Sequence, residues 1–102
     1  MTPEAKVKQQ VRRTLDELQI YYFFPPANGY GRAGIPDVIG CVLGRFIAVE
    51  CKAGKNTTTA LQERELARIK EAGGFAFVAN EHNIDQLREE LICVIQAASP
   101  SA

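Results

Sequence analysis

The sequence predicts an α/β protein whose mixed sheet is flanked by helices, with the elements in the order α-β-β-β-α-β-α. Two observations carry this prediction. Two short strand-like runs, residues 36–42 and 45–52, lie on either side of Leu43-Gly44 and predict an antiparallel hairpin. A strand–helix–strand passage then spans residues 45–79, and such a crossover joins parallel strands. A sheet of this kind packs most readily with helices on both faces.

The first predicted element is an amphipathic helix that begins at Pro3 and ends near Gln19. Thr2 is a favoured N-cap residue, and proline suits the first helical position because its missing N–H has no partner there. Apolar residues then recur at spacings of four, four and three, which places them on one stripe of the helix. The stripe consists of Val7, Val11, Leu15 and Leu18.

The aromatic run from Ile20 to Phe24 predicts a short strand, which the following two prolines end. Side chains alternate between the two faces of a strand, so one set of these aromatics is expected in the core. The other set would be free to cover a dimer partner. Residues 27–34 contain three glycines and are predicted to form a mobile loop.

The hairpin register decides which charged side chains meet. If Val42 faces Arg45 across the turn, Asp37 lies directly opposite Glu50, and cross-strand partners share a face. A four-residue loop would keep this pairing. An odd-numbered loop would put the two carboxylates on opposite faces, because a slip of one residue reverses every side chain.

The second half of the chain is predicted to hold a helix from about Ala60 to Ala72, which Gly73-Gly74 stops. A short buried strand from Phe75 to Ala79 follows, and Asn83 is expected to cap a last helix. The inner face of that helix is formed by Leu87, Leu91, Val94 and Ile95.

Length and composition limit the class of protein. The 102 residues suit one domain over residues 1–97 with a flexible tail over residues 98–102, and the modest core of such a chain would gain from association. No run approaches the ~18 apolar residues of a membrane span, and no signal peptide is evident. The three cysteines lack CxxC spacing, which favours reduced thiols in the cytoplasm over disulfides or a zinc cluster.

The formal net charge of zero argues against nucleic acid as a partner, but the charge is unevenly distributed. Residues 1–34 hold five Lys or Arg and three Asp or Glu, residues 35–80 hold six and five, and residues 81–102 hold one and four. The first three-quarters of the chain are thus weakly basic, which permits a phosphate-facing surface.

One face of the hairpin is apolar except at its end, where it carries three charges. Glu50 and Lys52 lie two residues apart on one strand and point to the same side as Asp37. Opposed carboxylates repel each other unless a divalent cation lies between them, and magnesium prefers such oxygen ligands. Lys52 would then position a water or offset the charge of a phosphate. A partly exposed salt bridge of Lys52 with either carboxylate is the structural alternative.

Two further polar residues begin core-facing helical stripes. Glu4 precedes Val7 by three residues and Gln62 precedes Leu66 by four, at positions where an apolar residue would be expected. Their alternatives are a solvated glutamate that interacts with the helix dipole and an exposed glutamine. If both converge with the hairpin charges, they complete a polar site.

These residues together resemble a known family. A helical glutamate, G-x-PD, ExK, a glutamine some ten residues later and GG before a strand are similar to the motifs of the VRR-NUC family. These proteins are virus-type replication-repair nucleases of the PD-(D/E)xK superfamily. The matching positions are Glu4, Gly34-Ile35-Pro36-Asp37, Glu50-Cys51-Lys52, Gln62 and Gly73-Gly74. The resemblance covers Glu4 through Ala79 without a departure at these positions.

The resemblance implies a restriction-endonuclease-like fold and hydrolysis of DNA phosphodiester bonds with Mg²⁺ or Mn²⁺. Lys52 would be the catalytic lysine, and Gln62 would orient the site or the attacking water. Stand-alone members look like homodimers that act on branched DNA such as Holliday junctions, and the compact length suits a bacterial or phage protein of the cytoplasm. The implied metal ligands are Asp37, Glu50, the backbone carbonyl of Cys51, and Glu4 through a water.

Basic residues near this site are candidate phosphate contacts, because DNA would lie along the start of the first helix and the glycine-rich loop. Ordinary solubilising charge is the alternative for each of them. The candidates are Lys8, Arg12, Arg32 and Lys55.

Two function classes follow from the sequence. The favoured hypothesis is a metal-dependent endonuclease. The alternative is a catalytically silent DNA-binding or assembly subunit on the same fold. A small-molecule or structural α/β domain is more remote, and it would lack salt-sensitive affinity for DNA.

Overall fold

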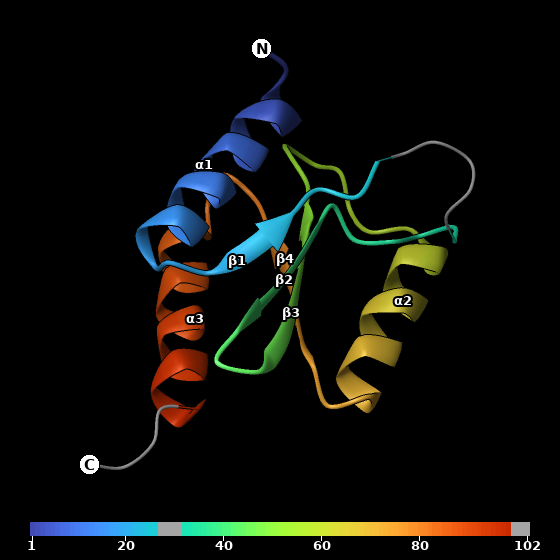
Figure 1. Cartoon of the computed structure of the whole chain (residues 1–102). Helices are drawn as coiled ribbons and strands as arrows, with labels where there is room; N and C mark the ends of the chain where they lie inside the picture. The colour runs from blue at the N-terminus through green and yellow to red at the C-terminus, as the bar shows by residue number, and fades with distance from the viewer. Residues whose placement is uncertain (27–31, 99–102) are drawn as a thin grey trace.

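The computed structural model describes residues 1–26 and 32–98 and has the predicted order of elements (Figure 1). The helices are α1 (Pro3–Glu17), α2 (Ala60–Glu71) and α3 (Ile84–Ala98). The strands are β1 (Tyr21–Phe23), β2 (Val38–Val42), β3 (Arg45–Cys51) and β4 (Phe75–Ala79). The glycine-rich segment 27–31 and the predicted tail residues 99–102 lie outside the described residues.

Within that part of the chain the strands form one four-stranded sheet in the order β1-β2-β3-β4. β1 and β3 both pair with β2 in antiparallel fashion, whereas β3 and β4 are parallel. Helices α1 and α3 cover one face of the sheet and α2 the other (Figure 1). The prediction of a mixed sheet flanked by helices is therefore confirmed.

The main core lies between the sheet and the pair α1 and α3. Val7, Val11 and Leu15 form the buried stripe of α1, as predicted. They pack with Ile47, Val49 and Cys51 of β3 and with Leu87 and Leu91 of α3. Because β3 is central and buried on both faces, every residue from Ile47 to Cys51 is less than a tenth exposed. The end of β3 is thus held rigidly.

The first helix begins as predicted and ends two residues early. The Thr2 hydroxyl accepts a hydrogen bond from the Ala5 N–H at 3.1 Å, which is the N-cap interaction. The helix ends at Glu17 because Gln19 adopts a left-handed φ of 57° that no helix can continue.

The turn of the hairpin fixes the register of β2 and β3. Leu43 and Gly44 both have positive φ, 50° and 78°, which is the two-residue geometry whose twist matches that of the strands. Val42 pairs with Arg45 and Val38 with Val49, as predicted. The strand itself begins at Val38 rather than at residue 36.

The prediction that β4 is a buried strand is wrong. Phe75 is 37% exposed and Val78 is 38% exposed, and only Ala79 at the end is buried. β4 lies at the edge of the sheet, so one side of the strand has no neighbour within the described chain. An edge strand exposes side chains that a central strand buries.

The aromatic strand β1 alternates as predicted. Tyr21 and Phe23 are 73% and 49% exposed, while Tyr22 and Phe24 pack against the core. Arg12 of α1 lies over the Phe24 ring at 4.0 Å and so covers part of this aromatic surface.

The last helix begins after Asn83, but the Asn83 side chain does not cap it in the expected way. Its backbone carbonyl accepts the N–H of Leu87, as an N-cap residue should. Its amide group bonds backwards instead, accepting from the Asn80 N–H and donating to the Val78 carbonyl. The helix continues through Ala98, and no helix of the described chain has the length and apolar character that a bilayer crossing requires.

Candidate functional site

Two carboxylates meet at the open end of the hairpin. Asp37 directly precedes β2, and Glu50 lies near the end of β3, one residue beyond the Val38–Val49 pair. Asp37 Oδ2 accepts a hydrogen bond from the Cys51 N–H at 2.8 Å, which fixes the carboxylate against β3. The register thus places Asp37 and Glu50 side by side, as the sequence predicted.

Glu50 lies in an environment that does not suit an ordinary carboxylate. It is 2% exposed, and its Oε2 is buried without a hydrogen-bond partner among the described residues. Burial above all, and then the hydrogen bond with Asp37 and the negative charge of that residue, raise the pKa of Glu50 to about 8. A buried acceptor without a hydrogen-bond partner lowers the stability of the fold by about 1–3 kcal/mol. A ligand that binds this oxygen atom would remove that cost.

The donor set fits a hard divalent cation. A cation beside Glu50 Oε2 would satisfy this atom and remove the repulsion from Asp37. Among the described residues no three His, Cys, Asp or Glu side chains gather into a metal-binding group. The protein would therefore supply two carboxylates, and a cation such as Mg²⁺ commonly keeps several waters in such sites.

Cys51 can contribute to such a site only through its backbone. Its side chain faces the core, and burial raises the pKa of the thiol to about 12. A thiol in this environment stays protonated at physiological pH and makes a poor metal ligand. The predicted use of the Cys51 carbonyl is compatible with this arrangement.

Lys52 follows β3 and lies close enough to act on Glu50. Its positive charge opposes the upward shift in the pKa of Glu50. Its backbone N–H donates to the Ala79 carbonyl at 2.9 Å, so β4 extends the ladder past the end of β3 and holds this residue. Lys52 is half-buried and its charge acts on Glu50, while its role as the catalytic lysine stays a prediction.

Glu4 reaches the site through Lys8. The Lys8 Nζ lies 3.8 Å from Glu4 Oε2 and 3.7 Å from Asp37 Oδ1. The negative charge of Glu4 also contributes to raising the pKa of Glu50, although it is the weakest of the causes. The structure therefore brings Glu4 near the carboxylate pair and places Lys8, a predicted phosphate contact, between Glu4 and Asp37.

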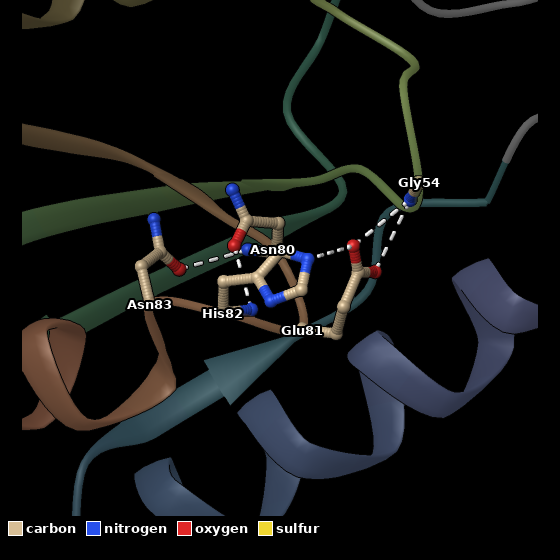
Figure 2. Close-up of polar contacts among 5 residues, drawn as sticks. All are labelled: Gly54, Asn80, Glu81, His82 and Asn83. Atoms are coloured by element: carbon tan, nitrogen blue, oxygen red, sulfur yellow. Dashed lines mark hydrogen bonds and ion pairs between the residues drawn. The ribbon is translucent and has the colours of Figure 1, made fainter.

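The turn after β4 holds the segment that follows Lys52, a feature that sequence reasoning missed. Both Glu81 oxygens accept the N–H of Gly54, at 3.0 and 3.2 Å (Figure 2). Hydrogen bonds among Asn80, His82 and Asn83 stabilise the turn itself (Figure 2). The His82 side chain is exposed. A carboxylate two residues past a strand is too common a pattern to have marked this contact.

A groove opens beside the site between the start of α1 and the segment after β3. It has a volume of about 530 Å³. Lys55, a predicted phosphate contact, is exposed along it and shares it with Glu4. The lining residues are Thr2, Pro3, Glu4, Ala53, Gly54, Lys55 and Asn56.

Gln62 has a structural role that the sequence also signalled. Its Oε1 accepts the Thr59 N–H at 2.9 Å, and its own N–H donates to the Thr59 hydroxyl at 3.2 Å. This is a reciprocal capping box, which the pattern T-x-x-Q encodes at positions 59–62. The cap explains a polar residue at this position without reference to catalysis, and the role of Gln62 in orienting a water stays a prediction.

The Arg32 side chain forms an ion pair with another residue of the chain. It forms an ion pair of 2.8 Å with Glu65, one of the two buried residues of α2. The pair ties the segment that leads to Asp37 onto α2. Arg32 and Arg12, which covers Phe24, thus both have protein partners, and their contacts with DNA stay predictions.

Gly34 is required by the close approach of the Asp37 segment to α2. A Cβ on Gly34 would lie 2.6 Å from the Leu61 carbonyl oxygen, and its φ of +82° disfavours any side chain.

We expect Gly34→Ala to cost about 2–4 kcal/mol in the free energy of unfolding. Gly44→Ala is the matched control, because φ is +78° there and, apart from its chain neighbours, no atom of the described residues lies within 4 Å of an added Cβ. It should cost only about 1 kcal/mol, and equal losses in urea unfolding would contradict the steric explanation.

Comparison with protein-family models, with curated proteins and with solved structures found no match. The structure defines the class of protein as a small α/β fold with a four-stranded mixed sheet in its described part and a carboxylate pair at the end of its central hairpin.

Proposed function

We propose that this protein is a metal-dependent endonuclease of the VRR-NUC type, with a restriction-endonuclease-like fold, that hydrolyses phosphodiester bonds in DNA. Branched DNA such as a Holliday junction is the proposed substrate class, and Mg²⁺ or Mn²⁺ the proposed cofactor. One observation carries the proposal: Asp37 and Glu50 meet at the hairpin end, and Glu50 Oε2 is buried with no hydrogen-bond partner in residues 1–26 and 32–98.

Each residue of the site has a defined part in the proposed reaction. Asp37 and Glu50 would hold the cation, with the Cys51 carbonyl beside them. When bound, Mg²⁺ or Mn²⁺ supplies Lewis-acid polarisation of the scissile phosphate and acidifies a water. Lys52 would stabilise the negative charge that develops on the phosphate, because a preorganised ammonium in a site of low dielectric acts strongly.

The surroundings would position the substrate and the catalytic lysine. The backbone is held at the Lys52 N–H by the Ala79 carbonyl and two residues later at Gly54 by Glu81. Lys55 in the neighbouring groove supports a phosphate contact along the path of the DNA. The bacterial or phage cytoplasm is the proposed setting.

A homodimer is part of this proposal. Tyr21, Cys41 and Phe46 are cross-strand neighbours in β1, β2 and β3, and all three are exposed on the face of the sheet that α2 covers only in part. An exposed apolar row of this kind is typical of protein interfaces. Sedimentation equilibrium measures the association, and a monomer at micromolar concentration would remove the dimer from the proposal.

The test is cleavage of four-way, flap and linear duplex DNA by the purified protein with Mg²⁺, with Mn²⁺ and with EDTA. We expect cleavage of the branched substrates with either metal and none with EDTA. Salt-sensitive binding without cleavage would favour the silent subunit instead. The absence of both would exclude a DNA-directed function.

Lys52→Ala separates the protein's own activity from a contaminating nuclease. We expect it to lower the cleavage rate by about 100-fold or more, because one preorganised charge at the reacting phosphate is lost. Lys70→Ala, an exposed lysine near the end of α2, is the matched control and should cleave as the wild type does. Equal rates for both variants would contradict the role of Lys52.

A further inference from the structure

One ammonium group lies between two carboxylates that belong to different elements. Lys8 is one helical turn after Glu4 on α1, and its Nζ lies 3.8 Å from Glu4 Oε2. The same atom lies 3.7 Å from Oδ1 of Asp37, the residue just before β2. The side chain is 36% exposed, so it has room to move away from the carboxylates.

Lys8 approaches a different Asp37 oxygen from the one that accepts the Cys51 N–H. Asp37 Oδ2 is already used by the Cys51 N–H at 2.8 Å, whereas Oδ1 faces Lys8. Both Lys8 distances exceed hydrogen-bond length, so the attraction is that of opposite charges without a fixed direction. Such a contact is readily exchanged for another cation.

We propose that Lys8 is the resident counter-ion of the metal-free site and competes with the divalent cation for Asp37. The inference rests on the proposed metal site. A divalent cation at Asp37 and the Lys8 ammonium repel each other at this separation, so binding of one disfavours the other. Lys8 therefore lowers the affinity for the metal, and it leaves Asp37 when the metal binds.

Displacement would give Lys8 a second use. Its ammonium, once released from Asp37 and Glu4, lies beside the proposed path of the DNA and is free to contact a phosphate. Metal binding would thus favour DNA binding, and DNA that attracts Lys8 would favour metal binding to the same extent. The predicted phosphate contact of Lys8 then belongs to the metal-loaded protein.

The experiment measures Mn²⁺ binding to the full chain without DNA, from the electron paramagnetic resonance signal of free Mn²⁺. We expect Lys8→Met to tighten binding about three- to tenfold, because the competing charge is lost while the apolar stem remains. Lys8→Arg keeps the charge and should bind within about twofold of the wild type. Lys6→Met removes an exposed lysine from the same helix and should also leave the affinity unchanged.

Thermal unfolding with and without Mn²⁺ gives a second readout that does not depend on catalysis. Lys8→Met should unfold at a lower temperature than the wild type in EDTA, since Glu4 and Asp37 then lack their counter-ion. It should gain more from Mn²⁺ than the wild type does. Circular dichroism establishes that each variant is folded.

The outcomes separate this inference from the proposed function. Unchanged or weaker Mn²⁺ binding by Lys8→Met, while Asp37→Asn loses binding, would overturn the inference and leave the metal site standing. Millimolar Mn²⁺ that binds neither the wild type nor Lys8→Met would overturn the metal site and the inference together. Tightening by Lys8→Met alone supports both.

Discussion

Replacement of Asp37 by asparagine is expected to lower the metal-dependent cleavage rate by about a thousandfold or more. The substitution removes one of the two negative charges that would hold the cation. Its shape is nearly the same, and the asparagine Oδ1 can still accept the Cys51 N–H that Asp37 Oδ2 now accepts at 2.8 Å. The loss should therefore come from chemistry and not from misfolding.

The measurement is the single-turnover cleavage rate with protein in excess over a labelled four-way junction. Asp85→Asn is the matched control, because Asp85 is an exposed aspartate in the first turn of α3. Its rate should equal that of the wild type. An Asp37→Asn protein that retains more than about a tenth of the wild-type rate would not be compatible with the proposed role of this carboxylate.

Replacement of Glu50 by glutamine is expected to abolish metal binding and to stabilise the metal-free protein. The buried carboxylate lies beside another carboxylate, and the nearby charge of Lys52 only partly offsets the cost of its desolvation. We expect a gain of about 1–3 kcal/mol at pH 8, or about 5–15 °C in the midpoint of thermal unfolding for a domain of this size. A stability gain with a loss of function is typical of a binding site.

The pH dependence follows from the direction of the shift. The pKa of Glu50 is raised from 4.5 to about 8 on folding, so the folded protein keeps a proton that the unfolded chain has released between these values. Stability then falls as pH rises from about 4.5 to about 8 and levels off above that. Glu50→Gln should remove this contribution. Metal binding must displace the same proton, so metal affinity should rise with pH over this window.

Unfolding midpoints in EDTA from pH 5 to pH 9 measure both effects. Glu89→Gln, an exposed glutamate in α3, serves as the control and should follow the wild type. A Glu50→Gln protein that is less stable than the wild type at pH 8 would show that the carboxylate is well accommodated without a metal. That result would remove the physical reason for a cation at this position.

The sequence predicted the arrangement of Asp37 and Glu50 because their meeting depends on local rules. A two-residue turn at Leu43-Gly44 fixes the pairing of its flanking strands, and the alternation of side chains then carries that register to the end of the hairpin. The capping box at Thr59 and Gln62 is equally local, because the pattern T-x-x-Q indicates it directly in the sequence.

The remaining features depend on contacts between distant parts of the chain. Glu81 and Gly54 are separated by 27 residues, and Arg32 and Glu65 by 33, so no spacing in the sequence marks either pair. The exposure of β4 followed from its place at the sheet edge, which its composition, FAFVA, did not reveal. The position of Lys8 between Glu4 and Asp37 required the packing of α1 against the end of the hairpin.

The most direct test of the central claim is a crystal of the wild-type protein soaked in MnCl₂ and measured for the anomalous signal of manganese. An anomalous peak in contact with the carboxylates of both Asp37 and Glu50, absent from crystals of Asp37→Asn, is the predicted result. A fully soaked crystal with no peak at this pair, or with manganese bound only elsewhere, would contradict the claim that the two carboxylates jointly bind a divalent cation.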